Sequence, residues 1–128
     1  MMPPATPRGR PEADLQRAVV RLLRAALPGA VIHHSANEVT GSGAAARRRQ
    51  AILVGMGVHA GFADLIVLAQ GRVLFLELKS PAGRVTPAQR AFGDAMRAQG
   101  HGWAEVRRLD DALAACAAAG IRVRAVLS

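Results

Sequence analysis

The spacing of apolar positions changes along the chain, and this change predicts an alternation of helices and strands. Between residues 12 and 27, apolar side chains recur every three or four positions, as on one face of a helix that ends before Pro28-Gly29. The runs on either side of Gln70-Gly71 are almost continuously apolar, which is typical of buried strands joined by a hairpin. The pattern also predicts helices over residues 44–54, about 87–99 and about 111–119, and strands over residues 31–34, 103–107 and 121–126.

Capping residues define the ends of two of these helices. Thr86 is a preferred N-cap, Pro87 suits the first helical turn, and Gln89 closes a capping box. Gly100 is expected to end the same helix, and Asp110 to cap the last one. The order is helix, strand, short helix, two strands, helix, strand, helix. It predicts a mixed α/β domain.

Three charged residues interrupt the apolar hairpin, although an unpaired buried ion is costly. A two-residue turn at Gln70-Gly71 places Asp64 directly opposite Glu77, with their Cβ atoms roughly 5 Å apart. Lys79 is two residues beyond Glu77 and shares its face. Two adjacent carboxylates repel each other, and a hard cation such as Mg2+ removes that repulsion. The hairpin therefore predicts a divalent-cation site beside an ammonium group.

The charge balance favours a polyanionic partner such as nucleic acid, because the chain has 17 Lys+Arg and only 9 Asp+Glu, which gives a formal net charge of +8. A GC-rich genome would also encode arginine and alanine freely, so charge alone is a weak argument. Lys79 is the only lysine, and a lysine in a tuned site can share a proton near neutral pH, whereas arginine stays charged. Two predicted helices carry arginines that either contact phosphates or form solvated faces: Arg17, Arg21, Arg24, Arg47, Arg48 and Arg49.

The 128 residues suggest a single domain over residues 11–128, preceded by a basic, proline-rich tail over residues 1–10 that we expect to be disordered. Cys116 is the only cysteine, which excludes a disulfide framework and a cysteine-based zinc site. The sequence has neither an apolar run of membrane-spanning length nor a signal-peptide pattern. We therefore expect a cytoplasmic protein without a membrane partner.

The charged residues occur in an order that resembles a known nuclease family. Glu12, Asp64, Glu77-x-Lys79 and the Thr-Pro-x-Gln helix start are similar to the VRR-NUC branch of the PD-(D/E)xK nuclease superfamily. The resemblance extends from Pro11 to about Gly120. It also includes Glu12-x-x-x-Gln16, Ala36-Asn37-Glu38, the approach over residues 55–65 and the motif over residues 75–80. Two departures are Ala63, where the family usually has proline, and Ala88, where an acid often precedes the glutamine.

This resemblance implies a restriction-endonuclease-like PD-(D/E)xK core, with a mixed β-sheet flanked by helices, and a metal-dependent DNA endonuclease. Asp64 and Glu77 would hold Mg2+ or Mn2+ together with the backbone carbonyl of Leu78. Glu12 would complete the site directly or through water, although an acid in a first helical turn also has a purely structural explanation. Lys79 would orient or deprotonate the attacking water.

The resemblance also implies substrates and partners. The products would carry 5′-phosphate and 3′-hydroxyl ends, and the substrate would be branched or duplex DNA, such as a four-way junction cut by a homodimer. Gln89 would support the catalytic site, although its capping box accounts for it equally. Arg84 joins the six arginines named above as a candidate for tracking the DNA backbone. The protein would come from a bacterium or a phage.

Two alternatives remain open at this point. One is a DNA-binding module that has a nuclease-like fold and no activity, which the intact set of charged residues argues against. The other is a zinc protein. Its candidate ligands lack glutamate or cysteine at zinc-motif spacing, and two of them are adjacent and so point to opposite sides of a strand: His33, His34, His59 and His101.

Overall fold

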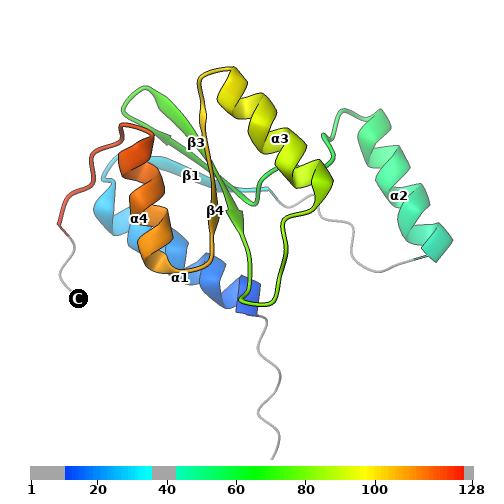
Figure 1. Ribbon diagram of the computed structural model, residues 1–128, viewed down its shortest axis with the longest axis horizontal. Coiled ribbons are helices and arrows are strands. Elements are labelled where there is room, and N and C mark those ends of the chain that lie inside the picture. Colours follow the sequence, from blue (N-terminus) through cyan, green and yellow to red (C-terminus); the bar gives the residue numbers. More distant parts are fainter. Residues whose placement is uncertain (1–10, 36–42, 126–128) are drawn as a thin grey trace, which may run out of the picture.

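The computed structural model describes residues 11–35 and 43–125 (Figure 1). The predicted tail over residues 1–10 and the Ala-Asn-Glu motif over residues 36–38 lie outside the described residues. The order of elements is the one that the sequence predicts. It runs α1 (Pro11–Ala26), β1 (Val31–His34), α2 (Gly43–Gly55), β2 (Leu65–Ala69), β3 (Arg72–Leu78), α3 (Pro87–Ala98), β4 (Gly102–Val106) and α4 (Leu109–Ala118).

The strands form one mixed sheet in the order β1-β2-β3-β4. β1 and β3 both run antiparallel to β2, whereas β4 runs parallel to β3. The hairpin has the predicted register, with Ala69 opposite Arg72. Gln70 (φ 55°) and Gly71 (φ 74°) both occupy the left-handed region that a two-residue hairpin turn requires. This register places Asp64, just before β2, opposite Glu77 near the end of β3.

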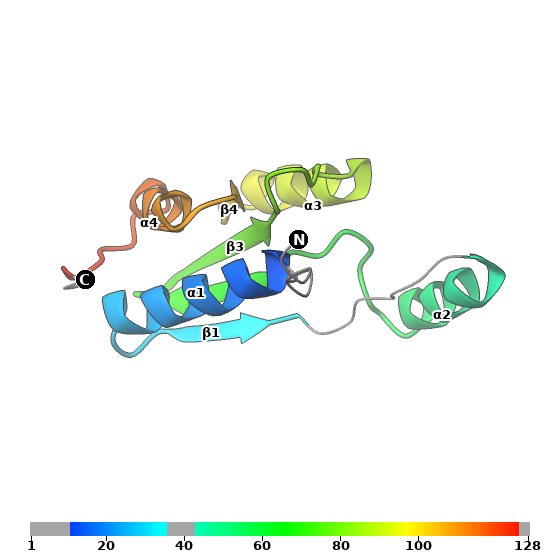
Figure 2. The same ribbon diagram turned by 90° about the horizontal axis from the view of Figure 1, so that it is seen from below.

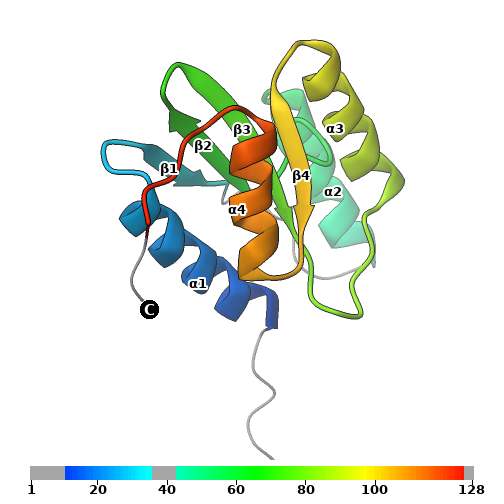
Figure 3. The same cartoon turned by 60° about the vertical axis from the view of Figure 1, so that its left-hand side comes forward.

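Helices cover both faces of the sheet, and each face has its own core. α1 and α4 pack on one face (Figure 3). There Leu23 and Cys116 belong to one buried cluster with side chains of β2 and β3. α3 covers the other face, where Phe92 packs against Phe75 and Trp103. Both Leu23 and Cys116 are fully buried, and burial raises the pKa of the Cys116 thiol. Cys116 is therefore a core residue.

α2 stands away from the sheet, as Figures 1 and 2 show. Its buried residue is Ala46, while Ile52 is 62% exposed. In the described part of the chain, no helix is both long and apolar enough to cross a membrane.

The start of α4 differs from the prediction. Arg108, not Asp110, is the N-cap. Asp111 is the third helical residue, and its carboxylate accepts hydrogen bonds from the backbone N–H groups of Arg107 (2.9 Å) and Arg108 (3.1 Å). The helix begins earlier than predicted because the carboxylate of Asp111, inside the first turn, accepts the hydrogen bonds at the helix start in place of a side chain at Asp110.

The predicted final strand is also wrong for residues 121–125, which form no strand, while residue 126 lies outside the described residues. The Gln70 amide group accepts from the N–H of Arg122 at 3.0 Å and donates to its carbonyl at 2.8 Å. The N–H of Arg124 donates to the carbonyl of Ala26 at the end of α1. The Gln70 side chain and the end of α1 thus form hydrogen bonds with backbone groups of this segment that would pair with a neighbouring strand if the segment were a strand.

Candidate active site

Asp64 and Glu77 face each other where the β2–β3 hairpin opens, one position beyond the last paired residues, Leu65 and Leu76. The Oδ2 atom of Asp64 accepts a hydrogen bond of 2.7 Å from the backbone N–H of Leu78. The hydrogen bond fixes the Asp64 carboxylate against the end of β3, beside Glu77. The structure therefore brings these two carboxylates together as the sequence predicts.

Glu77 is 1% exposed, and its Oε2 atom has no hydrogen-bond partner among the described residues. Its Oε1 atom lies 3.7 Å from the ammonium group of Lys79, which is also buried. The pKa of Glu77 is raised from 4.5 to about 8, mainly by burial and also by the charge of Asp64, while Lys79 partly offsets the rise. Lys79 therefore compensates a negative charge on Glu77 only in part.

A cleft of about 480 Å³ opens beside Asp64, whereas Glu77 and Lys79 are buried behind it and do not line it. It extends from the first turn of α1 to the end of β3, and its lining includes Glu12, Gln16, His34, Asp64, Leu78 and Ser80. The side chain of Glu12 is exposed within this cleft. The cleft therefore joins Glu12 to Asp64 although they are far apart in sequence.

Ser80, in the loop after Lys79, lines the cleft, and Gly83 of the same loop lies beside Glu12 and Lys79. A Cβ atom built on Gly83 would lie 3.4 Å from Oε1 of Glu12 and 3.4 Å from Cδ of Lys79. Glu12 and Lys79 thus both reach the same glycine from different elements. Arg84, the next residue of this loop, is exposed.

The donors suit a divalent cation in part. The unpartnered Oε2 of Glu77 and the adjacent Asp64 carboxylate are hard oxygen ligands. In a strand the N–H and C=O of one residue leave from the same edge, so the carbonyl of Leu78 lies on the side of Asp64. Over residues 11–35 and 43–125, however, no three His, Cys, Asp or Glu side chains gather closely enough to hold a metal. Glu12 therefore does not complete a ready-made set of three carboxylates.

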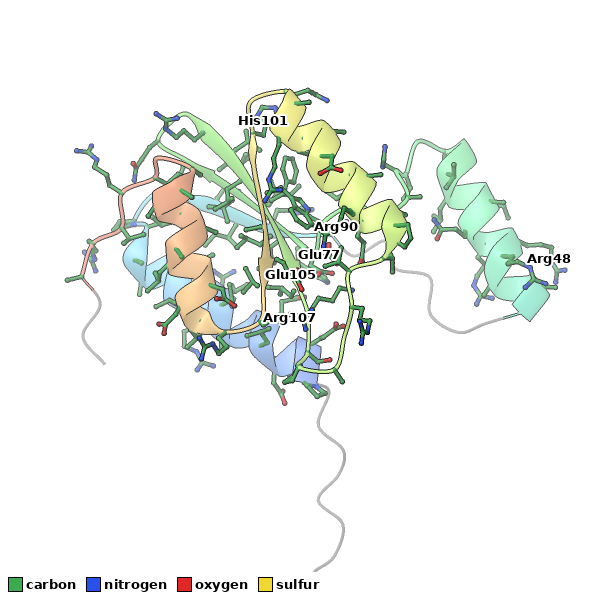
Figure 4. All side chains as sticks on the ribbon, viewed as in Figure 1. Arg48, Glu77, Arg90, His101, Glu105 and Arg107 are labelled. Carbon is green, nitrogen blue, oxygen red and sulfur yellow. The ribbon has the colours of Figure 1, made fainter. Side chains whose placement is uncertain are left out.

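Arg107 holds the loop that follows Lys79, a role that the sequence did not reveal. Its guanidinium donates to the carbonyl of Ser80 at 2.9 Å and to Oε1 of Glu105 at 2.7 Å. Glu105 is the register partner of Glu77 on the parallel strand β4, and Arg90 lies 3.9 Å from its other oxygen (Figure 4). Glu105 is thus neutralised by arginines, in contrast to Glu77.

A sequence signal for this network does exist. Glu105-x-Arg107 repeats the acid-x-base spacing of Glu77-x-Lys79. It becomes meaningful only once β4 is known to lie beside β3, and that pairing joins segments that a whole helix separates.

Gln89 takes part in the predicted capping box. Its Oε1 accepts from the N–H of Thr86 at 2.9 Å, and its own N–H donates to the Thr86 hydroxyl at 3.2 Å. The cap fully accounts for this side chain, so a catalytic role for Gln89 stays a prediction.

The predicted DNA-contacting arginines fall into separate groups. Arg17, Arg21 and Arg24 line a second cleft, of about 490 Å³, along α1. Arg48 lies on α2, away from Glu77 (Figure 4), together with its neighbours Arg47 and Arg49. Arg84 lies on the loop beside the first cleft. The α1 group is therefore the extended row nearest to the carboxylates.

The histidines give no support to a zinc site. Nδ1 of His34 lies 3.2 Å from the carbonyl oxygen of Asp64, and the His59 ring packs 5.6 Å from that of Phe92. Within the described ranges, none of these histidines lies in a group of three His, Cys, Asp or Glu side chains that could hold a metal ion. Their contacts are those of packing and hydrogen bonding.

Comparison with solved structures finds a chain described as a VRR_NUC domain protein. It superposes on this chain with a TM-score of 0.64, covering 88% of this chain and 89% of that chain at 24% sequence identity. Family models and curated proteins give no match. The structural likeness confirms the predicted fold, a mixed sheet flanked by helices as in a VRR_NUC domain, and agrees with the resemblance seen in the sequence motifs.

Proposed function

We propose that this protein is a metal-dependent DNA endonuclease of the VRR-NUC type. The observation that carries the proposal is the arrangement of Asp64, Glu77 and Lys79 at the open end of the hairpin. A buried carboxyl with an unpartnered oxygen, a second carboxylate beside it and an ammonium 3.7 Å away form an unusual combination for a protein core. The likeness to the VRR_NUC domain protein supports the same proposal through the fold.

Asp64, Glu77 and the carbonyl of Leu78 would hold Mg2+ or Mn2+, with Glu12 reaching the site across the cleft through water. When bound, such a cation supplies positive charge against the phosphate and lowers the pKa of a coordinated water. Asp64 is already oriented for this task by the N–H of Leu78. Glu77 would give up its proton on binding, because a metal ligand must be deprotonated.

Lys79 would act on the reacting groups directly. Its buried ammonium lies 3.7 Å from Glu77, and its neighbours Leu78 and Ser80 line the cleft, so it would hold the attacking water or a phosphate oxygen in place from beneath the cleft. The reaction proposed is hydrolysis of a phosphodiester, leaving a 5′-phosphate and a 3′-hydroxyl. Arginines near the cleft would contact phosphates independently of sequence.

The finer substrate preference belongs to the same proposal. We expect branched DNA, such as a four-way junction, as the preferred substrate of a homodimer, because a two-fold axis would present two clefts to two strands. A cytoplasmic location remains a prediction.

The test is a cleavage assay on labelled single-stranded, duplex, flap and four-way-junction DNA, with Mg2+, Mn2+ or EDTA. Lys79→Ala is run alongside, with Arg108→Ala as an exposed control at the start of α4. Metal-dependent cleavage that Lys79→Ala loses and Arg108→Ala keeps would support the nuclease. Tight binding without cleavage of any substrate would overturn it and favour the inactive DNA-binding module.

A further inference from the structure

A second cleft runs along α1, and we call it the α1 groove. Its volume is about 490 Å³. Arg17, Arg21 and Arg24 line it from the helix together with Val20, and Ile32 lines it from β1. The groove therefore combines a row of positive charge with an apolar surface.

The α1 groove is continuous with the catalytic cleft. Gln16 and His34 line both of them. Nδ1 of His34 lies 3.2 Å from the backbone carbonyl of Asp64, which places this ring at the junction of the two. A polymer lying in the groove would consequently pass directly to Asp64.

The arginines are spaced to follow a chain of charges. Arg17, Arg21 and Arg24 are separated by four and three residues, which corresponds to about 6 Å and 4.5 Å along a helix. Arg17 is partly satisfied by Asp14 at 3.3 Å, an exposed pair of small energetic value. Arg21 and Arg24 form no ion pair with any residue that the structure describes. The row thus offers charge to an outside partner.

The apolar lining favours a single strand over a duplex. Val20 and Ile32 give the groove a surface on which base faces can pack. A duplex turns its base faces inward and presents phosphates and groove edges, whereas an unpaired strand exposes bases and phosphates together. The mixture of arginine and aliphatic side chains matches the second case.

We propose that the α1 groove binds the backbone of one unpaired DNA strand and leads it to the catalytic cleft. This rests on the proposed function for the identity of the polymer and goes beyond it by naming the strand and its path. It implies that a flap is engaged through its unpaired arm, and that a fully paired four-way junction must open locally before one of its strands can enter the groove. It also separates the arginines of α1 from those of α2, which lie away from this path.

The test measures binding of a labelled single-stranded oligonucleotide and of the matching duplex by fluorescence anisotropy, in EDTA, over a series of NaCl concentrations. The variant is Arg17→Ala/Arg21→Ala/Arg24→Ala. Arg122→Ala is the control, because Arg122 lies beside the Gln70 turn at the opposite end of the hairpin from Asp64. A triple arginine-to-lysine variant keeps the charge while removing the guanidinium.

Each phosphate contact to a single strand contributes about 0.7 to the slope of log affinity against log salt, so losing three reduces it by about 2. Between 50 and 200 mM salt, the wild-type protein should then lose about 20-fold more affinity than the alanine variant. The lysine variant and Arg122→Ala should keep the wild-type slope. Melting curves of all variants show whether each is folded.

An unchanged slope in the alanine variant, or an equal loss for single strand and duplex, would overturn the inference. Because EDTA removes cleavage from the assay, the result is independent of the proposed nuclease activity. Groove-dependent binding without cleavage under any metal would leave the strand path intact and refute the enzyme. Cleavage by the wild type together with an unchanged salt slope in the alanine variant would support the enzyme and refute the strand path.

Discussion

The guanidinium of Arg107 donates a 2.9 Å hydrogen bond to the backbone carbonyl of Ser80, the residue directly after Lys79. The same guanidinium is held by Glu105, whose register partner is Glu77. Arg107, the residue directly after β4, thereby links the strand beside Glu77 to the loop that borders the cleft. This makes Arg107 a positioning residue for Lys79 and Gly83.

Arg107→Ala should lower the rate of cleavage by about 10- to 100-fold, since a hydrogen bond to a charged group is worth about 1.5–3 kcal/mol. The loss should lie in the single-turnover rate at saturating DNA, with DNA affinity nearly unchanged, because Arg107 reaches the loop and not the proposed strand path. Arg107→Lys should recover little, since lysine lacks the planar set of donors. Arg108→Ala is the matched control. Equal effects of the two alanine variants, or a loss of affinity alone, would contradict this role.

The buried carboxyl of Glu77 should make the metal-free protein less stable as pH rises. Its pKa is about 8 in the folded protein against an ordinary value of 4.5, so between these pH values the folded state holds a proton that the unfolded chain releases. The free energy of unfolding therefore falls as pH rises from 4.5 to about 8. Below pH 4.5, Glu77 does not reduce the free energy of unfolding. Above about pH 8, the reduction has reached its full size.

Glu77→Gln should remove this contribution, because glutamine cannot ionise. Chemical denaturation at several pH values in EDTA measures this. Between pH 4.5 and about 8, the free energy of unfolding of Glu77→Gln should rise relative to that of the wild type, by at most a few kcal/mol. Adding Mg2+ at pH 8 should stabilise the wild type and leave Glu77→Gln unchanged. Parallel pH profiles for the two proteins would refute the assignment.

Gly93 lets α3 approach the ring of Trp103. A Cβ atom built on Gly93 would lie 2.5–2.9 Å from three ring atoms of this tryptophan, closer than any packed contact allows. Gly93→Ala should cost about 1–3 kcal/mol of stability through overpacking. Gly55→Ala is the control, since nothing lies within 4 Å of its Cβ position. Similar melting temperatures for the two variants would show that α3 packs differently.

Local patterns were enough to predict most of the fold. Helix periodicity placed α1, the Thr86 capping box placed α3, and the Gln70-Gly71 turn set the hairpin register and therefore the meeting of Asp64 with Glu77. These features depend on neighbours in sequence, where propensity and turn chemistry act directly.

Features that depend on distant partners were less accessible. The final strand over residues 121–126 was predicted from apolar alternation, but Gln70 and the end of α1 take up its backbone groups in residues 121–125. The Arg107 network requires the parallel pairing of β4 with β3, which no local signal encodes. The α1 groove likewise exists only because α1 lies beside β1.

The central claim is that Asp64 and Glu77 form a cation site for phosphodiester hydrolysis. The most direct measurement compares cleavage of a labelled four-way junction by the wild type and by Glu77→Gln, in Mg2+ and in EDTA, with Arg122→Ala as the folded control. We expect the wild type and the control to cleave the junction in Mg2+ and not in EDTA, and Glu77→Gln to cleave it in neither. Undiminished cleavage by Glu77→Gln, or cleavage by the wild type in EDTA, would contradict it.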